Sequence, residues 1–600
     1  MNYHPMLDQL LTQHTILAVR ELFGADVGQE LNLVQKTRKE FDGDLTIVVF
    51  PLTKLLRKSP QIIGQELGKY LLERSGLVSS YQVISGYVNI TINPSYWKDF
   101  FCRNYQDPSY GILPQQPGDP VVIEYSSPNT NKPLHLGHIR NNLIGFSLAR
   151  ILSACGEKAV KVNLVNDRGI HICKSMLAWM KWSGGETPET TRLKGDHLIG
   201  KYYVLFETRY KEEVKHLVHT GLTEEEALRQ APLIAEAQHL LKKWEEKDPG
   251  TLALWHQMNQ WAYDGFDETY RQMGVDFDRI YYESDTYLPG KMLVEEGLSN
   301  GALQQKEDGS VWADLTENGL DWKLLIRSDG TSVYMTQDLG TAQLRYDEYH
   351  PKKLIYVVGN EQIYHFDVLK LILKKLGRDW SDNIYHLSYG MVELPEGKMK
   401  SREGKVVDAD DLMQEMFVTA EKMTRELGKM DDFSQEEASK LYRQVGLAAL
   451  KYFILKVDPM KTMVFNPEES IDFNGNTGPF IQYTYARIQS VLRKAADLEF
   501  ISTDTSLLDF NLVPKEITLL KLLYDFPSVV KEAGQTYSPA VIASYVYDLA
   551  REYNQFYHDH SILKAGDHSI VHFRLELSRF AGNVIKTSMG LLGIEVPERM

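Results

Sequence analysis

The chain has 600 residues, of which 43% are hydrophobic and 24% charged, a composition typical of a globular protein with several hydrophobic cores. Its net charge of −15 argues against non-specific binding to nucleic acid or to an acidic membrane surface. The three cysteines, Cys102, Cys155 and Cys173, are far apart and show no C-x-x-C spacing, so we expect neither a disulfide framework nor a metal site.

Residues 1–115 are predicted to form an α+β domain. Four segments have the patterns of regular elements: a helix at 7–17, a strand at 45–49, a helix at 59–75 and a strand at 88–92. Basic side chains cluster in the same part of the chain: Lys36, Arg38, Lys39, Lys54, Arg57 and Lys58. Most such clusters are solvated surface. If these side chains instead contact phosphates, nucleic-acid binding is expected to be strongly salt-dependent.

The first residues lack a basic segment followed by an apolar core and a cleavage site. Nowhere in the sequence do eighteen apolar residues follow one another, which is the length that a membrane-spanning helix needs. We therefore expect a cytoplasmic protein that does not contact a membrane.

After a linker at 114–120, the chain shows the pattern of a strand, a turn and a helix. Val121–Ile123 is apolar and β-branched, Ser126–Asn129 interrupts it, and an apolar periodic run begins at Leu134. Ala159–Val165 then returns as a strand, which predicts a βαβ unit with parallel strands. The sequence thus indicates an α/β domain built on a parallel sheet.

His135, Gly137 and His138 would lie at the carboxyl edge of that sheet, where α/β proteins bind ligands. A helix N-terminus at this edge offers free backbone N–H groups to an anion such as phosphate. Gly137 would let a nucleotide approach the backbone, and the imidazoles would donate to phosphate oxygens. The alternative is that the two histidines only cap the helix.

Further along, polar side chains again follow expected strands. Asn166–Gly169 ends the second strand, and Tyr334, Asp338 and Gln362 are expected at strand ends near 332–336 and 354–358. Asp-Gly pairs at 308–309 and 329–330 suggest hairpins. Other segments predicted from their patterns are a helical insertion at 183–251 with solvated faces, helices at 255–273 and 441–454, and a strand at 384–392.

Residues 126–140, SSPNTNKPLHLGHIR, resemble the signature of class I aminoacyl-tRNA synthetases, and the longer form S-P-N-x-x-K-P-x-H-x-G-H resembles the arginyl-tRNA synthetase family. Residues 266–287, 475–495 and 574–600 are also similar to that family, so the resemblance covers nearly the whole chain. Phe146 departs from the acidic residue of many members, and we assign it to packing.

The resemblance implies an α/β protein with four parts. These are an appended tRNA-binding α+β domain at 1–115, a Rossmann-like catalytic domain at 116–408 with the helical insertion, a helical connector at 409–470 and a helical anticodon-binding domain at 471–600. It also implies a monomer that ligates L-arginine to tRNA(Arg) with ATP, through arginyl-adenylate, and releases pyrophosphate and AMP. Magnesium is expected with ATP, although no dedicated cage for it is visible.

An arginine substrate needs an acidic pocket, because a guanidinium stays charged and offers five donors. The resemblance places Glu124 and Asp338 at the substrate's charged groups, Tyr334 against the guanidinium, Asn129 at the amino acid backbone and Gln362 at a polar contact. A single buried aspartate or tyrosine would more often be a structural hydrogen-bonding group, and the matching set is what points to a substrate pocket.

The same resemblance assigns the phosphate contacts to two segments of the chain. His135 and His138 would stabilise one side of the reacting phosphate with Gly137, and Gly397–Arg402 resembles the second class I signature, K-M-S-K-S. Ser401 stands at the usual second lysine position. Lys398 and Lys132 are therefore predicted as phosphate ligands, and Lys400 is the alternative. Such a lysine loop can close as charge develops.

For the anticodon, the predicted contacts are Phe480, Tyr483 and the terminal Met600, since unpaired bases stack on aromatic faces. The alternative fate of these aromatics, and of Tyr553, Phe556 and Tyr557, is core packing.

Two rival functions remain at this level. One is another class I synthetase or a nucleotidylyltransferase, for which an acidic pocket would have no use. The other is an RNA-binding or regulatory protein without catalysis, and the intact His135, His138, Lys398 and Asp338 argue against it.

Overall fold

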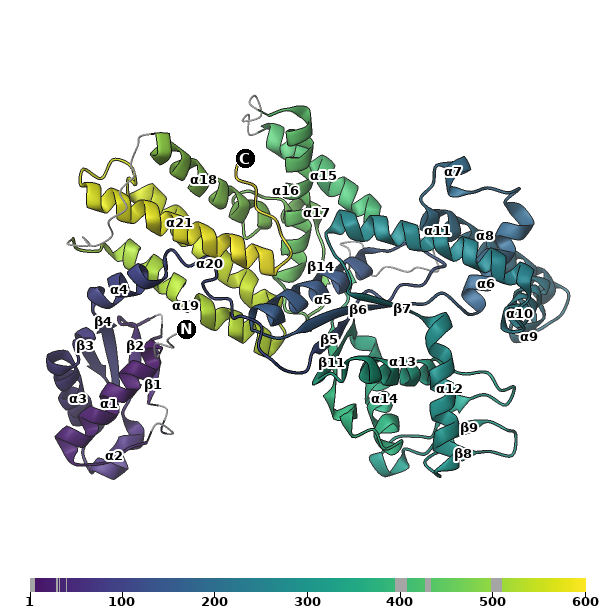
Figure 1. The fold of residues 1–600 in the computed structure, drawn as a ribbon, viewed down its shortest axis with the longest axis horizontal. Coiled ribbons are helices and arrows are strands. Elements are labelled where there is room, and N and C mark those ends of the chain that lie inside the picture. The colour runs from purple at the N-terminus through teal and green to yellow at the C-terminus, as the bar shows by residue number, and fades with distance from the viewer. Residues whose placement is uncertain are drawn as a thin grey trace. The chain divides into compact units, whose positions relative to one another are not determined.

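A computed structural model describes residues 6–28, 31, 33–38, 40–393, 407–426, 433–497 and 510–600 (Figure 1). The chain forms two compact units. Unit 1 comprises residues 1–108, 491–525 and 552–581, and unit 2 comprises residues 109–490, 526–551 and 582–600.

Unit 1 contains an antiparallel sheet of four strands in the order β1-β2-β4-β3. Its N-terminal elements are α1 (Leu7–Phe23), β1 (Val34–Lys36), β2 (Leu45–Val48), α2 (Phe50–Leu56), α3 (Pro60–Arg74), β3 (Val78–Ile84), β4 (Tyr87–Ile92) and α4 (Pro94–Asn104). Ile47 of β2, Val88 of β4 and Leu67 of α3 are fully buried and belong to its core. The helices and strands predicted within residues 1–115 are confirmed.

Aromatic packing joins the N-terminal part of unit 1 to its C-terminal segments. The ring of Tyr524 lies against those of Trp97 and Phe100, with centroids 5.7 and 5.3 Å apart. Two of the predicted basic residues are paired here, Lys36 with Asp525 at 2.7 Å and Lys58 with Glu66 at 2.8 Å. Their charge is therefore partly neutralised.

Unit 2 is organised around a five-stranded sheet in the order β12-β11-β5-β6-β7. Its strands are β5 (Val121–Glu124), β6 (Ala159–Val165), β7 (Arg279–Tyr282), β11 (Lys353–Gly359) and β12 (Ile384–Tyr389), and every neighbouring pair is parallel. All four residues of β5 are buried, as expected for a central strand. Helix α5 (Leu136–Ala154) joins β5 to β6 and confirms the predicted βαβ unit.

The strand order reverses at β5. The chain continues from β5 to β6 and β7 on one side, whereas β11 and β12 lie on the other side of β5. The carboxyl ends of β5 and β11 therefore flank the switch point, where doubly wound sheets bind their ligands.

The helical insertion follows the second parallel strand. It contains α6 (Ile170–Trp182), α7 (Pro188–Thr191), α8 (Gly195–His219), α9 (Glu224–Gln230), α10 (Pro232–Glu245) and α11 (Pro249–Met273). Thr223 and Glu226 form a capping box at α9. Helix α11 begins six residues before the predicted start, at a proline preceded by the N-cap Asp248.

Between β7 and β11 the chain forms α12 (Glu283–Ser299), β8 (Gln304–Gln305), β9 (Val311–Ala313), η2 (Thr316–Asn318), β10 (Lys323–Ile326) and α13 (Tyr334–Tyr349). Strands β8 and β9 pair antiparallel around Asp308-Gly309, which confirms the first hairpin. The second prediction is wrong in part. Asp329-Gly330 closes a single bridge between Ile326 and Ser332, and a helix follows instead of a strand.

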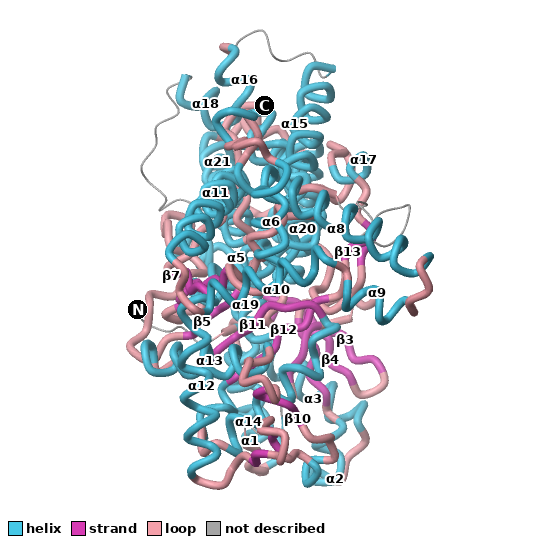
Figure 2. Tube along the Cα trace, turned by 90° about the vertical axis from the view of Figure 1, so that its right-hand side faces the viewer, coloured by secondary structure: helices cyan, strands magenta, loops and turns pink. Residues whose placement is uncertain are grey.

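Helices dominate the chain beyond residue 407 (Figure 2). After η3 (Asn360–Gln362), α14 (Ile363–Lys375), η4 (Asp379–Asn383) and β13 (Val392–Glu393) come α15 (Ala409–Glu426), α16 (Gln435–Leu455), β14 (Met463–Val464), α17 (Pro467–Ser470), α18 (Gly478–Asp497), α19 (Pro514–Thr536), α20 (Pro539–Asp559) and α21 (His568–Leu591). The predicted strand 384–392 is thus two strands, with a break at Gly390. No described helix has both the length and the apolar character needed to cross a membrane.

Candidate functional site

The turn after β5 holds two serines in a left-handed backbone conformation. Ser126 has φ 80° and Ser127 has φ 47°, which non-glycine residues rarely adopt. Their backbone N–H groups donate to the side chains of Asn141 and Asn163, and Ser127 Oγ donates to Glu124 Oε1 at 2.9 Å. Strain held by so many hydrogen bonds is typical of a functional site, here at the switch point of the sheet.

His135 and His138 cap the N-terminus of α5. His135 Nδ1 accepts a hydrogen bond from the Gly137 N–H at 3.1 Å, and His138 Nδ1 accepts one from the His135 N–H at 3.1 Å. Because each Nδ1 is an acceptor, the proton of each neutral ring is on Nε2. Both histidines therefore cap the helix through Nδ1, and this arrangement leaves both Nε2–H donors to bind another group.

The charge at this helix start comes from a lysine and not from the histidines. Burial and the nearby charge of Lys132 lower the pKa of His135 to about 4, and burial lowers the pKa of His138 well below its usual value. Both imidazoles are therefore neutral near pH 7. Burial also lowers the pKa of Lys132.

A cavity of about 810 Å³ opens beside the capped helix. Four predicted site residues line it: Asn129, Lys132, His135 and Tyr334. Its other wall is α8 of the insertion, with His197, Gly200 and Lys201 among the lining residues. Although solvated faces are predicted for the insertion, one face of α8 therefore lines the cavity.

Close packing fixes this wall. A Cβ on Gly200 would lie 2.8 Å from Cδ of Pro133, so only glycine lets α8 approach the loop before α5. No periodic pattern in the sequence indicates this contact, because the two segments are separated by more than sixty residues.

Glu124 is buried in an ion pair with Arg345 of α13. Their side chains are 7% and 0% exposed, and the Arg345 guanidinium lies 5.0 and 5.5 Å from the ring centroids of Tyr281 and Tyr356. Arg345 was not singled out from the sequence. The pair holds the Glu124 carboxylate rigidly under the switch point, and its charge is already shared with a protein cation.

Replacing Arg345 with leucine is expected to destabilise unit 2, because it leaves the Glu124 carboxylate buried without its partner. Breaking a buried pair in this way costs about 3–5 kcal/mol. Thermal unfolding should show a lower Tm for Arg345→Leu, and adding Glu124→Gln should restore most of the loss. An unchanged Tm in the single variant would contradict this role.

Tyr334 begins α13 and Asp338 follows in its second turn, so the prediction that they end a strand is wrong. Asp338 Oδ2 contacts His365 Nε2 at 2.6 Å, and although burial opposes it, this hydrogen bond raises the pKa of His365. Tyr334 is 69% exposed at the helix start, and Gln362 is exposed in η3 after β11. The described cavity lining includes Tyr334 but not Glu124, Asp338 or Gln362.

The predicted acidic residues nevertheless lie close together. Burial is the largest cause that raises the pKa of Tyr356. The charge of Arg345 opposes this shift, whereas the charges of Glu124 and Asp338 add to it. Burial together with Asp167 and Asp338 raises the pKa of Glu283 to about 8, despite the opposing charge of Arg168. Glu283 was not predicted from the sequence. The carboxyl end of the sheet at β5, α12 and α13 is thus rich in carboxyl groups.

Asn166 and Asp167, which are expected at the ligand crevice, form structural contacts beside the site. The Asn166 backbone bridges to Asn129, and the Asp167 carboxylate accepts hydrogen bonds from Ser284 and Tyr263 at 2.7 and 3.0 Å. Asp167 is 1% exposed, so its described contacts are internal.

A second cluster, missed from the sequence, fixes the segment at 407–411. Asp410 pairs with Lys194 and contacts His197 Nε2 at 3.1 Å, and Asp408 contacts the same His197 atom at 3.3 Å. The backbone of this segment is bonded to the start of α5, since Leu136 N donates to Val407 O and Ala409 N donates to Leu134 O, both at 3.0 Å. The cluster therefore ties α8 to the histidine-capped helix.

The carboxyl groups and imidazole of Asp196, His197 and Asp410 are close enough to hold a cation. The Lys194 ammonium already lies between Asp410 and Asp196, at 3.3 Å from the latter. Although burial opposes it, hydrogen bonds from His197 and Lys194 lower the pKa of Asp410 to about 2. The arrangement is accordingly an ion-pair cluster.

Asp410→Asn is expected to loosen this anchor and to lower the turnover number about tenfold, equal to about 1.4 kcal/mol of barrier. The hydrogen bond to Asp410 raises the pKa of His197, so its stabilising contribution is complete below pH 6.5 and is lost as the pH rises through the folded pKa. Turnover and Tm across pH 5.5–9 test this. The exposed neighbour Asp411→Asn serves as control, and equal pH profiles of the two variants would contradict the role.

The predicted anticodon residues lie in α18 and at the chain end. Phe480 is half-buried with its ring centroid 5.6 Å from that of Tyr547, and the Arg487 guanidinium lies 5.0 Å from the Tyr483 ring centroid. Met600 is partly exposed. Tyr553 and Phe556 are fully buried and belong to the core. Lys398, Lys400 and the rest of Gly397–Arg402 lie outside the described residues.

Three family models match the chain. Residues 113–466 match "tRNA synthetases class I (R), catalytic domain", residues 481–600 match "DALR anticodon binding domain", and residues 9–92 match "Arginyl tRNA synthetase N terminal domain".

Similar proteins span the same length. The chain is 58% identical to arginine–tRNA ligase of Parabacteroides distasonis, covering 99% of this chain and 100% of that protein, and 57% identical to arginine–tRNA ligase of Bacteroides thetaiotaomicron with the same coverage. The structure of Thermus thermophilus arginyl-tRNA synthetase aligns with a TM-score of 0.77 at 25% identity, over 99% of this chain and 100% of that one.

Proposed function

The chain belongs to the arginyl-tRNA synthetase family, and from this premise we propose how its residues divide the work of arginine–tRNA ligation. The enzyme ligates L-arginine to tRNA(Arg) with ATP, through arginyl-adenylate, and releases pyrophosphate and AMP. The observation that carries our assignment is the carboxyl-rich end of β5, α12 and α13 beside a cavity that the histidine-capped helix lines.

Arginine binds at the switch point of the sheet. Asp338 on α13 accepts hydrogen bonds from the guanidinium, because it is half-buried and its described ion-pair partner is a histidine. Tyr334 covers the guanidinium, Gln362 adds a polar contact and Asn129 binds the amino acid backbone. Glu124 contributes negative charge that Arg345 partly balances, and it fixes the Ser126-Ser127 turn through Ser127.

ATP binds at the start of α5 with its phosphates toward the helix N-terminus. Gly137 permits close approach, and the neutral imidazoles of His135 and His138 donate through Nε2 to phosphate oxygens as the arginine carboxylate attacks the α-phosphorus. Lys132 supplies positive charge from the cavity wall. Lys398, with Lys400 in reserve, supplies it from the segment resembling the second signature. Mg²⁺ accompanies ATP as its phosphate-bound counterion.

We assign the four domains as 1–115, 116–408, 409–470 and 471–600, the first and last of which bind tRNA. Phe480 and Tyr483 offer aromatic faces to anticodon bases, with Arg487 adding a cation above Tyr483. Met600 contacts the same loop. The protein works as a monomer in the cytoplasm.

Formation of AMP and pyrophosphate tests this assignment. Purified protein with ATP should release both only when arginine and tRNA are supplied together, because the family trait is activation that depends on tRNA. Release of equal amounts with lysine in place of arginine would contradict the assignment of the pocket.

A further inference from the structure

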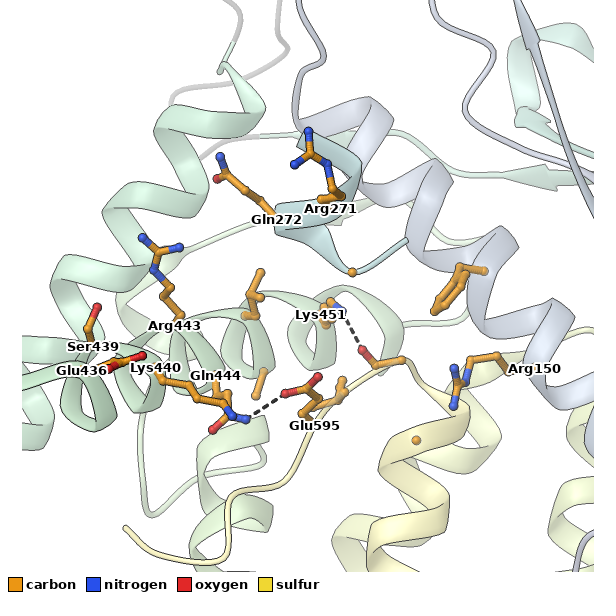
Figure 3. Close-up of a pocket in the computed structure, with 17 residues that line it drawn as sticks. Arg150, Arg271, Gln272, Glu436, Ser439, Lys440, Arg443, Gln444, Lys451 and Glu595 are labelled. Atoms are coloured by element: carbon orange, nitrogen blue, oxygen red, sulfur yellow. Dashed lines mark hydrogen bonds between the residues drawn. The ribbon is translucent and has the colours of Figure 1, made fainter. Parts of the chain in front are cut away.

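A second hollow, of about 610 Å³, is drawn in Figure 3. It has no lining residue in common with the cavity beside the start of α5. It is bounded by the ends of α5 and α11, by one face of α16 and by the segment that follows α21. Its apolar lining consists mainly of Phe146, Leu447, Ala448 and Ile594. This volume lies within the range of small-molecule sites, about 300–1,000 Å³.

Cationic side chains from three helices surround this hollow. They are Arg150 from α5, Arg271 from α11, and Lys440, Arg443 and Lys451 from α16 (Figure 3). Only Glu436 and Glu595 oppose them in the described lining, and the Glu595 carboxylate accepts a hydrogen bond from Gln444 at 2.8 Å. A local excess of positive charge is unusual for a chain with a net charge of −15, and it favours an anionic ligand.

Lys451 places a buried ammonium in the wall of the hollow. It is 4% exposed, and its Nζ donates to the Gly593 carbonyl at 2.6 Å. This hydrogen-bond partner is an uncharged carbonyl, and the charge of nearby Glu595 also acts on the ammonium. An ammonium has three donors, so the Gly593 carbonyl satisfies only one of them. Burial lowers the pKa of Lys451 to about 8, although the charge of nearby Glu595 opposes this shift.

The space around the ammonium is kept open by a glycine. A Cβ on Gly274, at the end of α11, would lie 3.4 Å from Lys451 Nζ, and the φ of Gly274 is 65°, as expected for a left-handed helix end. A larger residue there would narrow the approach to the buried charge.

We propose that this hollow binds a nucleotide, with its phosphate among Arg271, Arg443 and Lys451 and its base against the apolar lining. The mixture of an apolar wall and several cations matches the two parts of such a ligand. The nucleotide is either free or one unit of the bound tRNA, and the second source rests on the proposed function.

The test uses Arg271→Gln/Arg443→Gln in the full chain. Both side chains are exposed, so the double variant should fold with the Tm of the wild type. The control is Arg209→Gln/Arg229→Gln, which removes the same charge from exposed ion pairs on α8 and α9. Neither test residue lines the proposed ATP cavity, so charging at saturating tRNA should proceed at the wild-type rate.

Two measurements distinguish the sources of the nucleotide. If tRNA supplies it, the slope of log K against log salt in filter binding should fall by about 1 in the double variant, because both arginines contact the same phosphate. If it is free, equilibrium dialysis with radiolabelled ATP should give two bound ATP per wild-type chain and one in the variant.

Loss of either signal in the test variant but not in the control supports the site. If the wild type binds one ATP and both variants keep the wild-type salt slope, the site is overturned. If the wild type fails to charge tRNA with arginine, the proposed function is contradicted. The two binding measurements do not test that function.

Discussion

Asp338→Asn is expected to raise the KM for arginine by about 100- to 1,000-fold, the size of effect seen when one partner of a buried, hydrogen-bonded charge pair is lost. The substitution keeps the shape of the side chain and removes its charge. The amide also turns one acceptor into a donor, which faces the donors of the guanidinium. Initial rates of charging at varied arginine, with ATP and tRNA saturating, measure this change.

The matched control is Asp347→Asn, an exposed carboxylate on the same helix. It removes an equal charge from α13 and should leave the KM for arginine near the wild-type value. Equal KM values in Asp338→Asn and the wild type would remove Asp338 from the arginine site, whereas a parallel rise in both variants would mean that general charge, and not a direct contact, is responsible.

His138→Ala is expected to slow adenylate formation by about 100-fold, because a donor aimed at developing phosphate charge is lost. The affinity for arginine should change little. Single-turnover formation of arginyl-adenylate in the presence of tRNA measures the step. His219→Ala, an exposed histidine at the end of α8, is the control.

The pH dependence provides a further check on His138. Burial holds the pKa of His138 well below 6.5, so the wild-type ring stays neutral and its donor stays available from pH 6 to 8. A rate that fell as a group with a pKa near 6.5 lost its proton, in the wild type but not in His138→Ala, would contradict the neutral-donor role.

The sheet and the helix start could be predicted because their signals are local. The buried run Val121–Ile123, the Ser-Pro-Asn interruption and the periodic residues from Leu134 follow one another directly, and the structure confirms each element. The parallel pairing of β5 with β6 followed from the helix between them. The order of β11 and β12 on the far side of β5 has no such local signal.

The partners of the site residues could not be predicted for the same reason. Arg345 is 221 positions from Glu124, and Asp410 is 213 positions from His197, so no spacing in the sequence connects either pair. Tyr334 and Asp338 were assigned to a strand end because an Asp-Gly turn precedes them. Their helix begins where a single bridge at Ser332 replaces a second hairpin strand.

The most direct measurement is charging of total tRNA by the purified protein against each of the twenty amino acids in turn. A carboxyl-rich pocket beside a histidine-capped helix predicts that arginine alone is attached, with lysine excluded because its ammonium lacks the planar, forked donors of a guanidinium. Attachment of an uncharged amino acid at a comparable rate, with arginine inactive, would contradict the account.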